Sequence, residues 1–283
     1  MEWWLQHIRL RMFRRQLIRI PLLATLYVLA TSFGLSQADP ELALPDSTMR
    51  LSRGFAAGLE FIVAEPADVP EGAELPMVVY IHGRGDMPPA PTDTPFGVDA
   101  QVRWIFPRGP ARSGDGYAWM PVSAHHGESP ELLRALDESS RALSEAMMEW
   151  RRRYPTRGLP IVVGFSQGGM LAMDLAVTQE SAISHAFPIA GWLPPSRAPR
   201  RAADPYAMHV NVLALHGGAD PILSPARTER TLRALSALGY PMRFEMFDGV
   251  EHELSVAMRE RLKMELEAAL EELPESGHEA GHS

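Results

Sequence analysis

Cysteine is absent from all 283 residues. This absence excludes disulfide bonds, a thiolate nucleophile, zinc sites with cysteine ligands and the lipid-bearing cysteine of a bacterial lipoprotein. Internal repeats are absent too, and no second domain boundary stands out along the chain. With 46% hydrophobic and 22% charged residues, the composition is that of one ordinary globular domain with short extensions.

Basic residues are scarce outside the N-terminus. The formal net charge is −8, yet the first 38 residues carry five arginines and one acid. The remaining chain has 22 basic and 34 acidic residues, a net charge of −12. An acidic body of this kind disfavours nucleic acids and anionic membrane surfaces as partners.

The N-terminal segment has the pattern of an export signal. Its arginines, from Arg9 to Arg19, precede a mostly apolar run without charge at residues 20–35, and small residues follow at 36–38. An uncleaved membrane anchor is the alternative, but the run is shorter than the ~20 residues that span a bilayer. We therefore predict a signal peptide at residues 1–38, with Met12 as an alternative start, and a periplasmic or secreted protein without a membrane span after cleavage.

The rest of the chain alternates strand-like and helix-like segments. A linker or N-terminal arm is predicted at residues 39–55, a folded domain at 56–273 and a disordered tail at 274–283. Alternating strands and helices predict an α/β fold with a doubly wound, mostly parallel sheet and helices on both faces. Short apolar runs predict strands at 61–63, 77–81, 104–106, 161–163, 186–189, 212–215 and 242–247, and helical spacing predicts helices over 132–150, 232–238 and 254–270.

Two long segments without periodicity, 107–128 and 192–210, follow predicted strands. We expect both at the carboxyl edge of the sheet, where open α/β sheets bind their ligands. Loops of this length in a compact domain are usually functional or disordered.

The most informative motif is Gly-Phe-Ser-Gln-Gly-Gly at residues 164–169, between a predicted strand and a helical pattern. A G-x-S-x-G pattern in this context is typical of a nucleophile elbow, which exposes the serine at a sharp strand-to-helix turn. Its glycines have no Cβ, so the backbone can crowd through the turn. Ser166 is the predicted nucleophile.

A serine nucleophile needs a base, and the base needs a carboxylate that orients it. His252 follows the predicted strand at 242–247, and Asp220 lies in a tight turn after the strand at 212–215. These positions reproduce the chain order serine, acid, histidine of doubly wound hydrolases. Asp248 is the alternative acid; Glu251 and Glu253 are more distant candidates.

Two backbone N–H groups should hold the oxyanion of an acyl-transfer reaction. The expected donors are Gln167, directly after the nucleophile, and Arg84, in a glycine-rich loop after an early strand. His216 lies within the turn of the predicted acid and is expected to brace it. His125 and His126 are expected to line the substrate site rather than to bind a metal.

With these residues, the chain resembles the carboxylesterase/phospholipase family of α/β hydrolases, which includes acyl-protein thioesterases and small bacterial esterases. The resemblance rests on His-Gly-Arg-Gly-Asp at 82–86, the motif at 164–169, Gly-Ala-Asp-Pro at 218–221 and Glu-His at 251–252. It implies a triad of Ser166, Asp220 and His252, an oxyanion hole from Arg84 and Gln167, no cofactor, and ester or thioester substrates.

The predicted function is therefore an exported serine hydrolase that cleaves small carboxylic esters or thioesters through an acyl-enzyme on Ser166. Alternatives are a serine peptidase or polyester depolymerase on the same scaffold, and a catalytically silent binding protein. Trp119, Met120 and Trp192 are candidates for the acyl or alcohol pocket, or else cover the core. No metal is expected.

Overall fold

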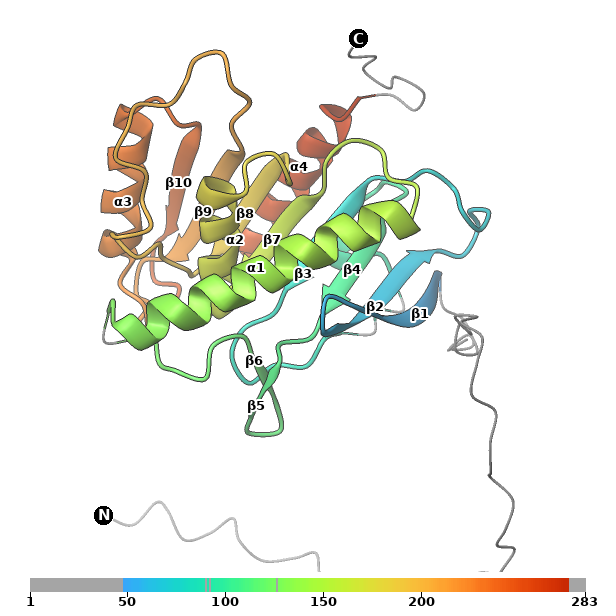
Figure 1. Cartoon of the computed structure of the whole chain (residues 1–283), viewed down its shortest axis with the longest axis horizontal. Helices are drawn as coiled ribbons and strands as arrows, with labels where there is room; N and C mark the ends of the chain where they lie inside the picture. The colour runs from blue at the N-terminus through green and yellow to red at the C-terminus, as the bar shows by residue number, and fades with distance from the viewer. Residues whose placement is uncertain (1–47, 90, 92, 126, 275–283) are drawn as a thin grey trace, which may run out of the picture. The chain divides into compact units, whose positions relative to one another are not determined.

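The computed structural model describes residues 48–89, 91, 93–125 and 127–274. An eight-stranded sheet forms the centre, in the order β1-β2-β4-β3-β7-β8-β9-β10 (Figure 1). Strand β2 is antiparallel to both of its neighbours, and the six strands from β4 to β10 in this order run parallel to one another. The predicted α/β fold with a mostly parallel sheet is confirmed.

The elements of the central sheet are β1 (Met49–Ala56), β2 (Leu59–Pro66), β3 (Met77–Ile81), β4 (Arg103–Pro107), β7 (Ile161–Phe165), β8 (His185–Ile189), β9 (Asn211–Gly217) and β10 (Met242–Phe247). The helices are α1 (Pro130–Arg153), α2 (Gln167–Thr178), α3 (Pro225–Ala237) and α4 (Val256–Glu271), with a short 3₁₀ turn η1 (Pro95–Gly97). A separate hairpin consists of β5 (Ala111–Ser113) and β6 (Gly116–Ala118).

The strands are apolar on both sides because the sheet is covered on both faces. Successive residues point to opposite faces of a strand, so Val78 and Ile161 pack in one buried cluster while Val79 and Val162 pack in the other. Helices α1, α2 and α3 contribute to the second cluster, and α4 contributes to the first. Helices therefore lie on both faces, as predicted.

Two helix starts are defined by serine caps. The Ser129 hydroxyl accepts from the Leu132 N–H at the start of α1, and the Ser255 hydroxyl accepts from the Met258 N–H at the start of α4. Such caps satisfy N–H groups that have no partner within the helix. Helix α4 thus begins at a defined point, which limits the length of the loop that carries His252.

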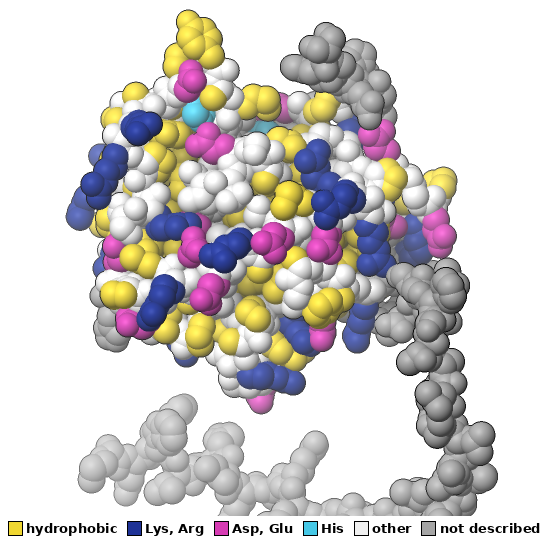
Figure 2. All heavy atoms as spheres, viewed as in Figure 1, with side chains coloured by type: hydrophobic (Ala, Val, Ile, Leu, Met, Phe, Trp, Pro, Cys, Tyr) yellow, Lys and Arg dark blue, Asp and Glu magenta, His cyan; other side chains and the backbone are white. Residues whose placement is uncertain are grey.

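On the face that carries α1, acidic and basic side chains are interspersed rather than separated (Figure 2). Along this helix, Glu131 pairs with Arg134 and Asp137 with Arg141, one turn apart and largely exposed. Exposed pairs of this spacing contribute about 0.3–0.5 kcal/mol each. The stability of α1 therefore comes from its buried stripe.

The predicted linker at residues 39–55 is wrong over 49–55. These residues form most of β1, which pairs with β2 along its whole length. The strand was missed because it lies at the edge of the sheet and carries polar residues: Arg50 forms an ion pair with Glu65 at 3.0 Å. An edge strand is half solvated, so it lacks the continuous apolar run of the central strands.

The predicted signal peptide at residues 1–38 and all but the first residue of the predicted tail lie outside the described residues. No helix in the described part of the chain is both long and apolar enough to cross a membrane. The two long loops leave from the carboxyl ends of β4 and β8, at the edge of the sheet where β7 also ends. The first of them contains the β5–β6 hairpin.

Candidate active site

Ser166 lies alone between the end of β7 and the start of α2, with φ 56° and ψ −112°. A non-glycine residue at positive φ is strained, and such strain is concentrated at functional sites. The turn also needs its glycines: a Cβ on Gly168 would lie 2.0 Å from the Ile81 carbonyl oxygen, and one on Gly164 would lie 2.1 Å from that of Gly168. The geometry is that of a nucleophile elbow.

The structure brings Ser166, Asp220 and His252 together. The Nε2 atom of His252 is 2.9 Å from the Ser166 Oγ, and its Nδ1 atom is 2.7 Å from the Asp220 Oδ2. The three residues follow β7, β9 and β10, whose carboxyl ends share one edge of the sheet. A proton can pass from the hydroxyl to the imidazole at these distances.

Asp220 is held by four hydrogen bonds. Its Oδ1 accepts from the N–H groups of Ile222 and Leu223 at 2.8 and 2.9 Å, and its Oδ2 faces His252 and His216. Burial acts to raise the pKa of this carboxyl, but the hydrogen bonds from Leu223, His252 and Ile222 outweigh it, so the pKa lies below its ordinary value. The side chain is therefore an oriented, charged acceptor.

The alternative acids do not reach the histidine. Asp248, Glu251 and Glu253 are exposed, and no hydrogen bond or ion pair joins any of them to His252 among the described residues. The Asp220 carboxylate occupies the Nδ1 side of the ring instead.

His216 braces the acid, as predicted. Its Nε2 lies 3.1 Å from Asp220 Oδ2 and 2.9 Å from the Leu223 carbonyl oxygen, so this nitrogen carries a proton and donates. The ring is fully buried, which lowers its pKa, and its Nδ1 has no partner among the described residues. His216 is thus a neutral donor to Asp220.

We expect the free energy of unfolding to fall between pH 7 and pH 5, in part because of His216. Its folded pKa is lowered, so below about pH 6.5 the unfolded state binds more protons and acid favours it. The contribution of His216 to the free energy of unfolding is fully present above that pH. Below it, this contribution falls by up to about 1.4 kcal/mol per pH unit. Urea unfolding at several pH values should show a shallower slope for His216→Gln; equal slopes would contradict this expectation.

The two predicted oxyanion donors are free to bind a ligand. Within the described part of the chain, neither the backbone N–H of Gln167 nor that of Arg84 donates to a protein acceptor. The neighbouring Gly83 N–H donates to the Asp86 carboxylate at 3.0 Å. The Arg84 side chain is exposed, with its Nε 3.4 Å from the Ser113 hydroxyl.

A family model described as Phospholipase/Carboxylesterase matches residues 64–270, which is most of the chain. The chain belongs to this family. The suspected resemblance is confirmed, and the membership assigns the protein to the ester hydrolases.

Two relatives match this carboxylesterase-family protein over most of their own length. Lysophospholipase-like protein 1 from Mus musculus is 24% identical over 213 residues, covering 69% of this chain and 87% of its own. Acyl-protein thioesterase 1 from Cryptococcus neoformans is 24% identical over 236 residues, covering 71% and 95%.

Solved structures agree in fold. The Bacillus cereus carboxylesterase superposes with a TM-score of 0.58 at 19% identity, over 75% of this chain and 94% of its own. TT1662 from Thermus thermophilus superposes with a TM-score of 0.57 at 22% identity, over 79% and 98%. At this identity the likeness concerns the α/β-hydrolase fold.

The predicted pocket residues of this family member lie in its core. Trp119, Met120 and Trp192 are each 1% exposed or less and belong to the cluster beneath α1 and α2. Arg227 also covers the ring of Trp192, 4.6 Å from its centroid. Contact with substrate stays a prediction for all three.

Of the other histidines singled out, His125 has its Nδ1 2.7 Å from the Ile222 carbonyl oxygen, close to the acid's turn. Residue 126 lies outside the described residues. The sequence predicted no role for His82, although it belongs to the motif at 82–86; in the structure it is 1% exposed and accepts from the Gly109 N–H in the loop after β4. Its place directly before the predicted oxyanion loop was the available signal.

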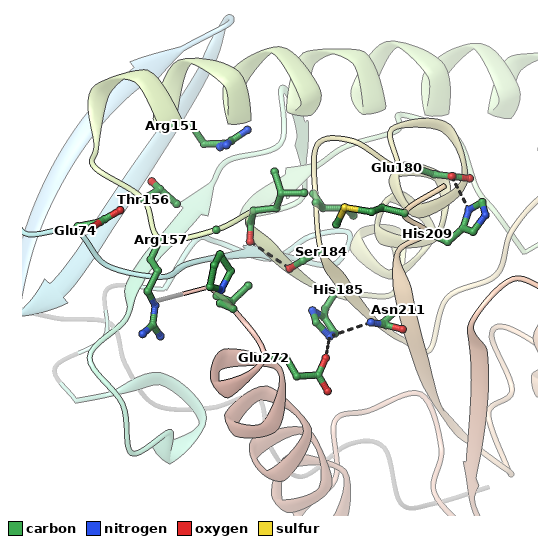
Figure 3. A pocket seen from close by; sticks show the side chains of 16 residues that line it. Glu74, Arg151, Thr156, Arg157, Glu180, Ser184, His185, His209, Asn211 and Glu272 are labelled. Carbon is green, nitrogen blue, oxygen red and sulfur yellow. Dashed lines mark hydrogen bonds and ion pairs between the residues drawn. The ribbon is translucent and has the colours of Figure 1, made fainter. Parts of the chain in front are cut away.

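A cavity of about 650 Å³ lies at the opposite edge of the sheet, where β8 and β9 begin (Figure 3). His185 and Asn211 line it, together with Glu272 at the end of α4; the imidazole lies 3.1 Å from the carboxylate. None of its lining residues is Ser166, Asp220 or His252. Its volume therefore says nothing about the reaction site.

Proposed function

We propose that the protein is a serine hydrolase that cleaves carboxylic esters and thioesters through an acyl-enzyme on Ser166. The observation that carries this proposal is the continuous chain from the Ser166 hydroxyl through His252 to Asp220, at 2.9 and 2.7 Å, on a strained elbow.

In the first half-reaction, His252 Nε2 accepts the hydroxyl proton as the Ser166 oxygen attacks the acyl carbon. Asp220 stabilises the resulting imidazolium through Nδ1. The N–H groups of Gln167 and Arg84 bind the oxyanion of the tetrahedral intermediate. His252 then gives its proton to the leaving alcohol or thiol.

In the second half-reaction, water attacks the acyl-enzyme and His252 accepts its proton. The Ser166 oxygen leaves with that proton, and the carboxylic acid product departs. Apart from the substrate and this water, every group that takes part in these steps belongs to the chain.

The substrate class is supported by the family and by the relatives' names, which include a carboxylesterase, an acyl-protein thioesterase and a lysophospholipase-like protein. Within that class we propose small-molecule esters and thioesters as substrates.

A fluorophosphonate probe tests the nucleophile. We expect one stoichiometric adduct on folded protein, located at Ser166 by peptide mass spectrometry, with none on heat-denatured protein or on Ser166→Ala. Folded protein without an adduct would remove the proposal. A panel of chromogenic esters and thioesters of varied acyl length, beside an anilide, would then define the leaving group.

We also propose that the protein is exported. The support is the arginine-rich segment followed by the uncharged apolar run at residues 20–35 and small residues at 36–38. In a bacterial host, the mature protein should begin near residue 39 and fractionate with the periplasm or the medium. Full-length protein retained in the cytoplasm would contradict export.

A further inference from the structure

We infer that Trp119 is a positioning residue that sets the spacing between the two oxyanion donors. The inference rests on the proposed function, because it assigns a role within the oxyanion site. The donors Arg84 and Gln167 belong to different segments, the loop after β3 and the start of α2. Trp119, in the loop after β6, bonds to both segments.

All three polar groups of Trp119 are used. Its backbone N–H donates to the Gln167 side-chain Oε1 at 3.0 Å, and its indole N–H donates to the His82 carbonyl oxygen at 3.1 Å. Its own carbonyl oxygen accepts from the Ser139 hydroxyl at 2.9 Å, which ties the residue to α1. One residue therefore spans the two halves of the site, through its backbone N–H toward Gln167 and its indole toward His82.

The contact with Gln167 is specific in orientation. Its Oε1 also accepts from the Met120 N–H at 3.3 Å, and its Nε2 donates to the carbonyl oxygens of Met120 and Val122 at 2.8 and 3.4 Å. Backbone N–H groups can only donate, so the amide oxygen must face Trp119 and Met120. The residue that supplies one oxyanion donor is thus clamped to residues 119–122.

The other half is held through His82, two residues before Arg84. Its ring Nε2 accepts from the Gly109 N–H at 3.0 Å, so the proton resides on Nδ1, which donates to the Gly83 carbonyl oxygen at 2.7 Å. Burial lowers the pKa of His82, which keeps this neutral form. The segment before Arg84 is therefore rigid, and the Trp119 indole sets its distance from α2.

The indole bond distinguishes Trp119 from the other tryptophans in the described part of the chain. The indole N–H groups of Trp104, Trp150 and Trp192 are buried without a hydrogen-bond partner there. A hydrogen bond from a buried indole N–H fixes the orientation of the ring, which apolar packing alone does not. Misplacement of an oxyanion donor is costly, because shifts near 1 Å can lower rates by about 10²-fold.

The test compares Trp119→Phe with Trp150→Phe. Both changes remove a buried indole from the same core cluster, but only the first removes a hydrogen bond. Each variant is assayed with an aryl ester and its thiono analogue, in which sulfur, a weak acceptor, replaces the carbonyl oxygen. Melting temperature and fluorophosphonate labelling confirm the fold.

For Trp119→Phe we expect kcat to fall roughly ten-fold with little change in KM, because oxyanion donors act on the transition state. The preference for the ester over the thionoester should fall with it. Trp150→Phe should keep the wild-type preference. Unchanged kcat and preference in Trp119→Phe, or equal losses in both variants, would overturn the inference.

Gln167→Glu is made in parallel and decides the question if Trp119→Phe does not fold. It keeps an acceptor for the N–H groups of Trp119 and Met120 but places a second carboxylate oxygen against the carbonyls of Met120 and Val122. The same fall in ester preference supports the inference, and its absence overturns it. Failure of the proposed function is distinct: wild-type protein would then show neither hydrolysis nor labelling.

Discussion

Replacing Ser166 by alanine is expected to lower kcat for ester hydrolysis by four to six powers of ten. The hydroxyl lies 2.9 Å from His252 Nε2, and without it the proposed acyl-enzyme cannot form. Members of a triad act as a unit, so the loss of one costs about as much as the loss of all. Residual turnover above water would come from the oxyanion donors and binding.

Single-turnover and steady-state kinetics with an activated ester measure this loss. Ser184→Ala is the matched control, since Ser184 lies at the opposite edge of the sheet and lines the cavity there. It should keep the wild-type kcat. A Ser166→Ala protein that is folded and retains more than about one percent of kcat/KM would mean that another residue is the nucleophile.

The largest effect on stability is expected from Arg197→Leu, at about 3–5 kcal/mol of unfolding free energy. Asp174 is fully buried on α2, and Arg197 contacts both of its oxygens, at 2.6 and 2.8 Å. Ser140 adds a hydrogen bond at 2.6 Å. Without the guanidinium, the carboxylate would be left as a buried charge, with the Ser140 hydroxyl as its remaining side-chain donor among the described residues.

The pair also joins two segments that lie next to the proposed active site. Arg197 lies in the long loop after β8, and Asp174 lies on the helix that begins at the elbow. The hydrogen bond to Asp174 raises the pKa of Arg197, in keeping with a strongly held cation. Loss of the pair should therefore loosen this loop as well as lower stability.

Chemical denaturation of the wild type, Arg197→Leu and the double variant Arg197→Leu/Asp174→Leu measures the effect. The double variant should recover much of the loss, because it removes the unpaired charge. Arg233→Leu, which breaks an exposed pair with Glu229, is the control and should cost less than about 1 kcal/mol. A loss of that size for Arg197→Leu too would contradict the expectation.

Much of the fold was predictable from local pattern. The seven predicted strands are all present, and those at 77–81 and 242–247 have the predicted bounds. Continuous apolar runs identify strands that are buried on both faces wherever they occur. The edge strand β1 escaped because half of its surface is solvated and its polar residues pair across to β2.

The candidate site also has features that the sequence predicts and features that depend on tertiary packing. By itself the sequence determined the elbow around Ser166, since only glycines fit the close backbone approaches there, and it determined the order of serine, acid and histidine along the chain. Tertiary structure decided that Asp220 rather than Asp248 faces His252, and that Trp119 lies in the core between two loops. The physical reason is range: backbone strain and strand period act between neighbours in sequence, whereas side-chain direction and burial depend on which distant segments pack together.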